Sequence, residues 1–267
     1  MKRPIITLTT DFGTKDGYVG AVKGVIKKIN PEAELIGITH EIEPFDILGA
    51  AFALNNFYRY FPKGSIHLVA VDPGVGSERQ ALLIKSEDFF FVGPDNGVFN
   101  FIFENERINE IIVLSNKKYF LATLSSTFHT RDIFAPVAAY LSLGIDIREF
   151  GNSAEECVKL LFPQPSSTKK SIVGEIIHID NFGNLITNIG TQLLDNKNVV
   201  HIDVEKKKIK QISQSYFDVP KKEVGAVIGS SGFLEISMNQ GSAAKALNSK
   251  IGLAVKVSFR SIGSSPN

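Results

Sequence analysis

Tryptophan is absent from this chain of 267 residues, and Cys157 is its single cysteine. One cysteine excludes an internal disulfide and any zinc cluster built on several cysteines. No uncharged stretch approaches the roughly 20 residues that a membrane-spanning helix needs, and the apolar run before Asp11 is too short for a signal peptide. These features predict a cytoplasmic protein without a membrane partner.

An excess of charge of one sign is lacking too, because 29 Lys and Arg face 28 Asp and Glu, for a net charge of +1. Such a balance gives no reason to expect a nucleic-acid partner, and the basic run 206–208 is interpreted as a solvated turn. The chain is rich in apolar residues instead, with 43% hydrophobic residues and 20 Phe. That supply is enough for one large domain or two smaller ones.

The first half of the sequence alternates strand-like apolar runs with helical spacing. Strands are expected at 5–10, 35–39, 66–71, 81–85, 89–92 and 111–114, and helices at 18–29, 45–61, 96–104 and 133–143. This alternation predicts an α/β domain with a mainly parallel sheet and helices on both faces. Ligands gather at the carboxyl ends of the strands in such sheets. Asp11 and Asp72 follow two of the predicted strands and are expected on that edge.

The composition changes at 162–170, where two prolines and two serines indicate a linker. Beyond it the apolar runs are short, and a helix is expected only at 242–247. The short runs lie at 172–179, 185–188, 199–204, 224–228, 233–238 and 253–259. They predict an all-β, barrel-like second domain. The predicted domains are therefore residues 1–163 and 171–267.

Polar residues gather among glycines in five segments, at 10–20, 71–79, 127–132, 180–184 and 229–243. Glycine allows close approach to a ligand, but it also simply makes turns. No segment has the spacing of a Walker or Rossmann phosphate loop.

Asp72, Arg79 and His129 form the most reactive combination in these segments. An Asp–Arg pair about 4 Å apart is worth roughly 4 kcal/mol at an effective dielectric constant near 20, and a nearby histidine can orient water or take a proton. The alternative is a salt bridge that only tethers a loop, beside an unrelated histidine. The four other histidines are expected in ordinary polar or packing roles; they are His40, His67, His178 and His201.

Seven motifs occur in one order across most of the chain: TDFG, HEIEPFD, VDPGVGSER, FVGPDNGV, TFHTRDIFAP, DNFGN and GSSGFLEI. Together they resemble the S-adenosyl-L-methionine (SAM) hydroxide adenosyltransferase family, whose relatives include the bacterial fluorinase and chlorinase. The resemblance implies hydrolysis of SAM to adenosine and L-methionine, without a cofactor or metal. It also implies a homotrimer in which SAM binds between one subunit's first domain and its neighbour's second.

Site residues follow from the same resemblance, position by position. It implies a catalytic triad of Asp72, Arg79 and His129, with Asp72 also touching the substrate. Asp11 would hold the ribose hydroxyls and Phe45 would form an apolar wall. The remaining predicted contacts lie in the second domain: Asn184 for adenine, Ser230 for the methionine end, Glu235 for the methionine ammonium, and the backbone around Met238 and Gln240 for the adenine edge.

Two other functions stay open at this point. A SAM-dependent halogenase needs a pocket of neutral donors for halide, whereas the charge of Asp72 would repel an anion, an effect that Arg79 only partly offsets. A non-catalytic SAM or adenosine sensor would not need all three polar triad positions. Adenosine formation, and a halogenated nucleoside in the presence of halide, distinguish the three functions.

Overall fold

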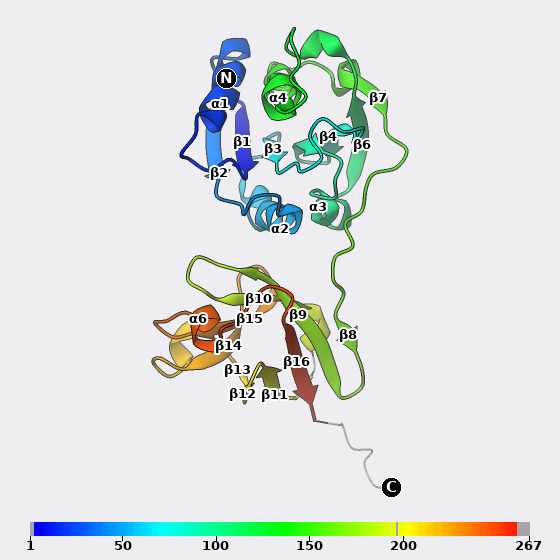
Figure 1. Ribbon diagram of the computed structural model, residues 1–267. Helices are drawn as coiled ribbons and strands as arrows, with labels where there is room; N and C mark the ends of the chain where they lie inside the picture. Colours follow the sequence, from blue (N-terminus) through cyan, green and yellow to red (C-terminus); the bar gives the residue numbers. More distant parts are fainter. Residues whose placement is uncertain (1–2, 196, 261–267) are drawn as a thin grey trace. The chain divides into compact units, whose positions relative to one another are not determined.

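The computed structural model describes residues 3–195 and 197–260, which form two compact units, one up to Leu160 and one from Leu161 (Figure 1). The first unit is built on a mixed sheet of seven strands among the described residues, in the order β2-β1-β3-β5-β4-β6-β7. Their bounds are β1 Ile5–Thr10, β2 Glu34–Thr39, β3 Ile66–Ala70, β4 Ala81–Ser86, β5 Phe90–Pro94, β6 Ile108–Leu114 and β7 Gly151–Ser153. Neighbours β2, β1, β3 and β5 are parallel, whereas β4 is antiparallel to both its neighbours and β7 to β6. The predicted α/β domain is confirmed, and its sheet is mixed, with three parallel and three antiparallel pairs of neighbouring strands.

Helices cover both faces of this sheet, which explains why its central strands are buried almost throughout. They are α1 Tyr18–Ile29, α2 Ile47–Phe57, α3 Asn100–Asn105 and α4 Ala135–Ser142. Helices α1 and α4 lie on one face, over Leu8 and Leu68, and α2 and α3 lie on the other, over Val69 and Phe91 (Figure 1). The faces of the sheet are therefore covered, and polar groups can lie in the loops at the ends of its strands.

The largest differences from the expected helix boundaries concern α2, α3 and α4. Helix α2 ends at Phe57 and continues as a 3-10 turn at Tyr58–Tyr60, and a π-helical turn at Thr130–Phe134 precedes α4. Helix α3 begins at Asn100, four residues later than predicted, because the Asn96 side chain accepts a hydrogen bond from the Val98 backbone N–H (3.2 Å) and makes a turn there.

The second unit consists of a sheet of nine strands in the described part of the chain, in the order β12-β11-β16-β9-β10-β15-β14-β13, with β8 paired to β9. The bounds are β8 Ser166–Ser167, β9 Ser171–Ile179, β10 Leu185–Gly190, β11 Val199–Val204, β12 Lys207–Ile209, β13 Ile212–Ser213, β14 Val224–Ile228, β15 Phe233–Met238 and β16 Ala254–Phe259. Two short helices accompany them, α5 Thr191–Leu194 and α6 Ala243–Leu247. All of these pairs are antiparallel except β13–β14.

The core of the second unit collects the inward side chains of the curved sheet, among them Ile172, Leu185, Ile202, Leu234 and Val257. The all-β, barrel-like prediction is thus confirmed, whereas the segment expected as a linker contributes strand β8. Among the residues described, no helix combines the length and the apolar character that crossing a membrane requires.

Candidate active site

The two aspartates predicted at the carboxyl edge of the sheet lie beyond neighbouring strands. β1 and β3 are parallel, with Thr10 opposite Ala70. Asp11 directly follows β1, and Asp72 lies two residues beyond the end of β3. Parallel pairing thus brings the two loops that begin at these residues to one edge.

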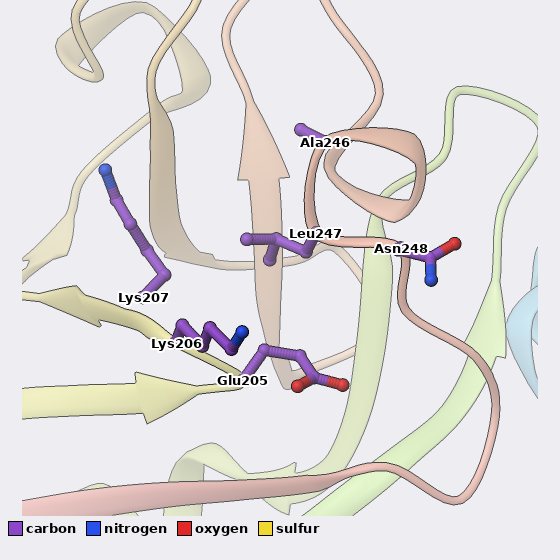
Figure 2. Close-up of a pocket in the computed structure, with 6 residues that line it drawn as sticks. All are labelled: Glu205, Lys206, Lys207, Ala246, Leu247 and Asn248. Carbon is purple, nitrogen blue, oxygen red and sulfur yellow. The ribbon is translucent and has the colours of Figure 1, made fainter.

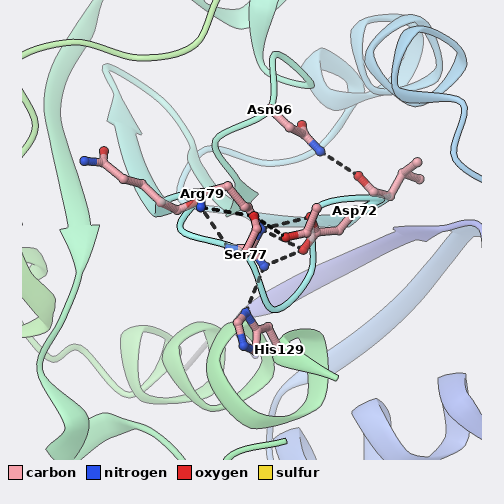
Figure 3. A network of polar contacts seen from close by, with 8 residues as sticks. Asp72, Ser77, Arg79, Asn96 and His129 are labelled. Atoms are coloured by element: carbon pink, nitrogen blue, oxygen red, sulfur yellow. Dashed lines mark hydrogen bonds and ion pairs between the residues drawn. The ribbon is translucent and has the colours of Figure 1, made fainter. Parts of the chain in front are cut away.

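Asp72 and Arg79 form a largely buried ion pair (Figure 3). The Arg79 Nε–H donates to both carboxylate oxygens of Asp72 at 2.9 Å, and an Nη2–H also donates to Oδ2. The Arg79 and Asp72 side chains are 10% and 7% exposed. The Arg79 guanidinium also lies 5.4 Å from the ring centroid of the buried Phe134. A charged pair held in this way has little orientational freedom.

His129 joins the pair through the same arginine. An Arg79 Nη2–H donates to His129 Nδ1 at 3.0 Å, and guanidinium nitrogens are always donors. Burial, and next the Arg79 cation, lower the pKa of His129, which keeps the imidazole neutral at neutral pH. A neutral ring that accepts at Nδ1 carries its proton on Nε2, so Nε2–H is left as a donor.

The loops that carry the three residues touch each other closely. Gly76 has a φ of +82°, and a Cβ there would overlap the Ser126 carbonyl oxygen. On the other loop the fully buried Asp132 carboxylate accepts from the Ser125 backbone N–H (2.7 Å) and from Arg131 (2.6 Å). The 72–79 turn and the segment before His129 are therefore held in register.

Asp11 and Phe45 are joined by a hydrogen bond from the Phe45 backbone N–H to Asp11 Oδ2, at 3.0 Å. Phe45 is 70% exposed and has a φ of +70°, a conformation rare for a bulky residue. Such strain concentrates at ligand sites. Next to Asp11, the Phe12 ring lies 5.8 Å from Phe128, the neighbour of His129. The predicted ribose carboxylate and the triad thus share one edge of the first unit.

In the second unit, Asn184 is held by Asp180, a residue that the sequence pattern does not mark as functional. The Asp180 carboxylate accepts from the Asn184 backbone N–H and from its Nδ2–H, both at 2.8 Å, and from the Phe182 N–H at 2.9 Å. Asn184 is 8% exposed. Its Oδ1 and second N–H are left as one acceptor and one donor, which is the pattern that an adenine edge requires.

Glu235 is buried, at 6% exposure, and its Oε2 accepts from the Tyr216 hydroxyl at 2.6 Å. Burial raises the pKa of Glu235, and the Asp180 charge raises it further, against the effect of the Tyr216 hydrogen bond. Burial raises the pKa of Tyr216, and so do its hydrogen bond to Glu235 and the charge of Asp180, so the three side chains share one neighbourhood. Asp180 was hidden in the sequence because DNFGN has the composition of a simple turn.

The other predicted residues of the second unit lie on the chain around β15. Ser230 is exposed in the turn before the strand, and Met238 is its half-buried last residue. Gln240 is exposed, with a φ of +53°, and its carbonyl oxygen accepts from Lys222 Nζ at 2.5 Å. The roles of these residues, and of all the site residues, stay predictions.

A cavity of about 450 Å³ lies elsewhere in the second unit, beside the end of α6 (Figure 2). Its lining is Glu205, Lys206, Lys207, Ala246, Leu247 and Asn248, and none of these is a predicted site residue. Within residues 3–195 and 197–260, no three His, Cys, Asp or Glu side chains are placed to hold a metal ion. A reaction without metal or cofactor stays a prediction.

Most of the chain is similar to proteins of one known family. The models of the SAM hydroxide adenosyltransferase N-terminal and C-terminal domains match residues 6–151 and 174–256. The (R)-S-adenosyl-L-methionine hydrolase of Methanocaldococcus jannaschii is 41% identical over 91% of this chain and 92% of its own. A fluorinase of Actinoplanes sp. N902-109 is more distant, 25% identical over 95% and 97%. The crystal structure of an uncharacterized conserved protein from Thermotoga maritima is similar with a TM-score of 0.87 and 38% identity, over 94% of this chain and 99% of that one.

Proposed function

The chain belongs to the SAM hydroxide adenosyltransferase family, and we propose that it hydrolyses SAM to adenosine and L-methionine. The single observation that carries the proposal is the sharing of Arg79 between Asp72 and His129. A loop-tethering salt bridge does not need a third polar group on the same guanidinium. The names of the relatives support the same reaction.

The reaction needs a water-derived nucleophile in line with C5′. Its oxygen forms a bond to C5′ while the C5′–S bond breaks, and the bonding pair leaves on sulfur as a neutral thioether. One water proton is released. No acid is required for the leaving group, because the sulfonium already carries the positive charge.

Full deprotonation of water before attack is too costly for His129 to perform. Water has a pKa near 15.7 and free imidazole one near 6.5, a gap worth roughly 12 kcal/mol, and burial and Arg79 lower the pKa of His129 further. General-base assistance normally supplies only ~10²–10⁴-fold. Positioning in a dry pocket can supply ~7–11 kcal/mol, so it contributes more to the acceleration than proton transfer does.

We assign the triad residues complementary tasks on this basis. The Arg79 guanidinium stabilises negative charge that develops on the attacking oxygen. His129 orients that oxygen by donating from Nε2, and the Asp72 carboxylate holds Arg79 and accepts from the water. Because it accepts from that water, Asp72 takes up the released proton, which then passes to solvent.

Binding is divided between the two units. Asp11 Oδ2 accepts from Phe45 and still has a second lone pair, so both carboxylate oxygens can face the ribose diol. Phe45 supplies an exposed apolar wall. Asn184 pairs with adenine, Glu235 attracts the methionine ammonium with the help of Asp180, and Ser230 and the backbone at Met238–Gln240 complete the contacts.

Incubation of the protein with SAM, followed by chromatography, tests the proposal. We expect equal amounts of adenosine and methionine, and ¹⁸O from labelled water in the 5′-hydroxyl. A halogenated nucleoside in the presence of chloride or fluoride would instead identify a halogenase. Tight SAM binding without any product would identify a sensor.

We further propose a homotrimer in which SAM binds between the first unit of one subunit and the second unit of its neighbour. Large aromatic side chains are exposed on both units, Phe45 at 70%, Phe182 at 76% and Phe217 at 90%, and burial between subunits would remove them from water. A cytoplasmic location stays a prediction.

Mixing two variants tests the shared site at a SAM concentration well below KM, where Arg79→Ala is almost inactive and Asn184→Ala keeps about a tenth of wild-type activity. Arg79→Ala alters only the first unit and Asn184→Ala only the second, so mixed trimers with inter-subunit sites contain some intact sites and regain activity. If each site belonged to one subunit, every site would carry a substitution and mixing would restore nothing. Light scattering on the wild type gives the subunit number.

A further inference from the structure

We propose that Asn96 is a positioning residue, which fixes the peptide before Asp72 and thereby aims the Asp72 carboxylate at Arg79. Its kinetic consequence depends on the proposed function, whereas its effect on the ion pair does not. The Asn96 Nδ2–H donates to the Val71 carbonyl oxygen at 2.9 Å (Figure 3). Asn96 itself does not touch the triad side chains in any of these hydrogen bonds, so it acts through the backbone.

The Val71 carbonyl lies just beyond the end of β3, where strand pairing no longer fixes the direction of the backbone. β3 ends at Ala70, and its last pair with β5 is Leu68 with Val92. Val71 is fully buried, and a buried carbonyl left without a donor is destabilising. Asn96 supplies that donor from the loop after β5.

The hydrogen bond fixes the orientation of the peptide that precedes the Asp72 Cα. Holding the Val71 carbonyl sets the plane of the Val71–Asp72 peptide, and φ of Asp72 is the rotation of the Asp72 Cα relative to that plane. Pro73 restricts ψ of Asp72, because a residue before proline favours extended conformations. The Asp72 carbonyl also accepts from the Val75 N–H at 3.2 Å. Asn96 therefore fixes the orientation of the Val71–Asp72 peptide, which the sequence of the turn by itself leaves free.

Asn96 is well suited to this task because its own loop is fixed. Its Oδ1 accepts from the Val98 N–H at 3.2 Å. On one side the Asp95 carboxylate accepts from the Val158 N–H at 2.8 Å. On the other, Gly97 has a φ of +93°, and a Cβ there would lie 2.8 Å from Leu160 Cβ.

The same loop also reaches the arginine side of the pair. The Asp95 backbone N–H donates to the Gln80 carbonyl at 2.9 Å, and Arg79 Nη1 donates to that oxygen at 3.2 Å. The loop 95–97 thus contacts the backbone next to both partners, and its displacement would misalign the ion pair without removing a charged group.

Asn96→Asp and Asn96→Ser test the proposal, because each keeps an oxygen for the Val98 N–H. An ionised Asp has no donor for the Val71 carbonyl, and the Ser hydroxyl ends one bond short of the Nδ2 position that donates to it. In ¹⁵N-labelled protein we expect the Arg79 Nε–H, which donates to both Asp72 oxygens, to exchange with solvent about tenfold faster in both variants. With SAM as substrate we expect kcat to fall at least about tenfold and KM to stay within about threefold. If Asn96→Asp does not fold, Asn96→Ser carries the test.

Asn105→Ala is the matched control, since its Nδ2 donates to Asn55 at the exposed end of α3, at 3.2 Å. It should leave both the exchange rate and kcat unchanged. The proposal is overturned if either the exchange rate or kcat of the Asn96 variants equals that of wild type, or if Asn105→Ala reproduces their effects. Absence of any SAM turnover by wild type would reject the proposed function instead, and the exchange rate would then decide the role of Asn96 alone.

Discussion

The two units carry polar groups of opposite design. In the first unit charged side chains bind each other, with Arg79 between Asp72 and His129, on turns that backbone contacts hold in place. In the second unit a side chain holds the backbone, since Asp180 accepts from two backbone N–H groups and orients Asn184. The first design suits stabilisation of a charge that develops during reaction, and the second suits recognition of a ligand already formed. Substitutions in the two units should therefore affect turnover and binding separately.

The largest effect is expected for Arg79→Ala, which removes the cation shared by the other two residues. We expect kcat to fall by about 10³-fold, whereas the dissociation constant for SAM should change by less than about threefold, because the field acts mainly in the transition state. Single-turnover kinetics and calorimetry measure the two quantities. Equal losses in both would break the contrast between the units.

Gly76→Ala should follow, because a Cβ at this position overlaps the Ser126 carbonyl oxygen. A separation of the two loops by about 1 Å is expected to lower kcat by about 10²-fold, with SAM binding little changed. Gly64→Ala is a sharp control, since its φ is +84° but a Cβ there meets nothing within 4 Å. The control should lose about 1 kcal/mol of unfolding free energy and keep its kcat; a loss of activity there too would point to general strain.

Asn184→Ala tests the second unit. We expect about tenfold weaker binding of adenosine, near 1.4 kcal/mol, with kcat at saturating SAM almost unchanged. Isothermal calorimetry with adenosine measures this directly. An unchanged dissociation constant would remove Asn184 from the site.

The smallest effect is expected for Glu235→Gln, roughly threefold weaker SAM binding at pH 7.5. Burial raises the pKa of Glu235 above its usual value of 4.5, so the carboxylate is charged above that raised pKa and neutral below it. Wild-type affinity for SAM should therefore fall as the pH is lowered through the raised pKa of Glu235. The affinity of the variant should depend less on pH. A steeper profile in the variant would assign the titration to another group.

The frame of the first unit could be predicted closely, because apolar periodicity is a local signal. Strand Ile5–Thr10 and helix Tyr18–Ile29 have the predicted bounds. The late start of α3 was missed because the Asn96 side chain competes with helix formation there. Strand β12, Lys207–Ile209, was missed because two of its three residues are lysines and its pairing with β11 is a tertiary interaction.

Part of the candidate site could also be predicted from the sequence. Asp11 and Asp72 could be placed by the rule that parallel strands end at one edge. The approach of His129 to Arg79, by contrast, depends on the π-helical turn and on Gly76 against Ser126, neither of which has a pattern in one sequence. The importance of Asp180 appears only when its bonds to Asn184 are seen.

The bond between Asp11 and the backbone of Phe45 has a consequence for how this family can vary. Loss of the aspartate would release the aromatic residue from its left-handed conformation, so one substitution would remove two contacts at once. Effects at the two positions should then be less than additive, and natural sequences should keep or change the carboxylate and the geometry of its partner together, as one inherited unit.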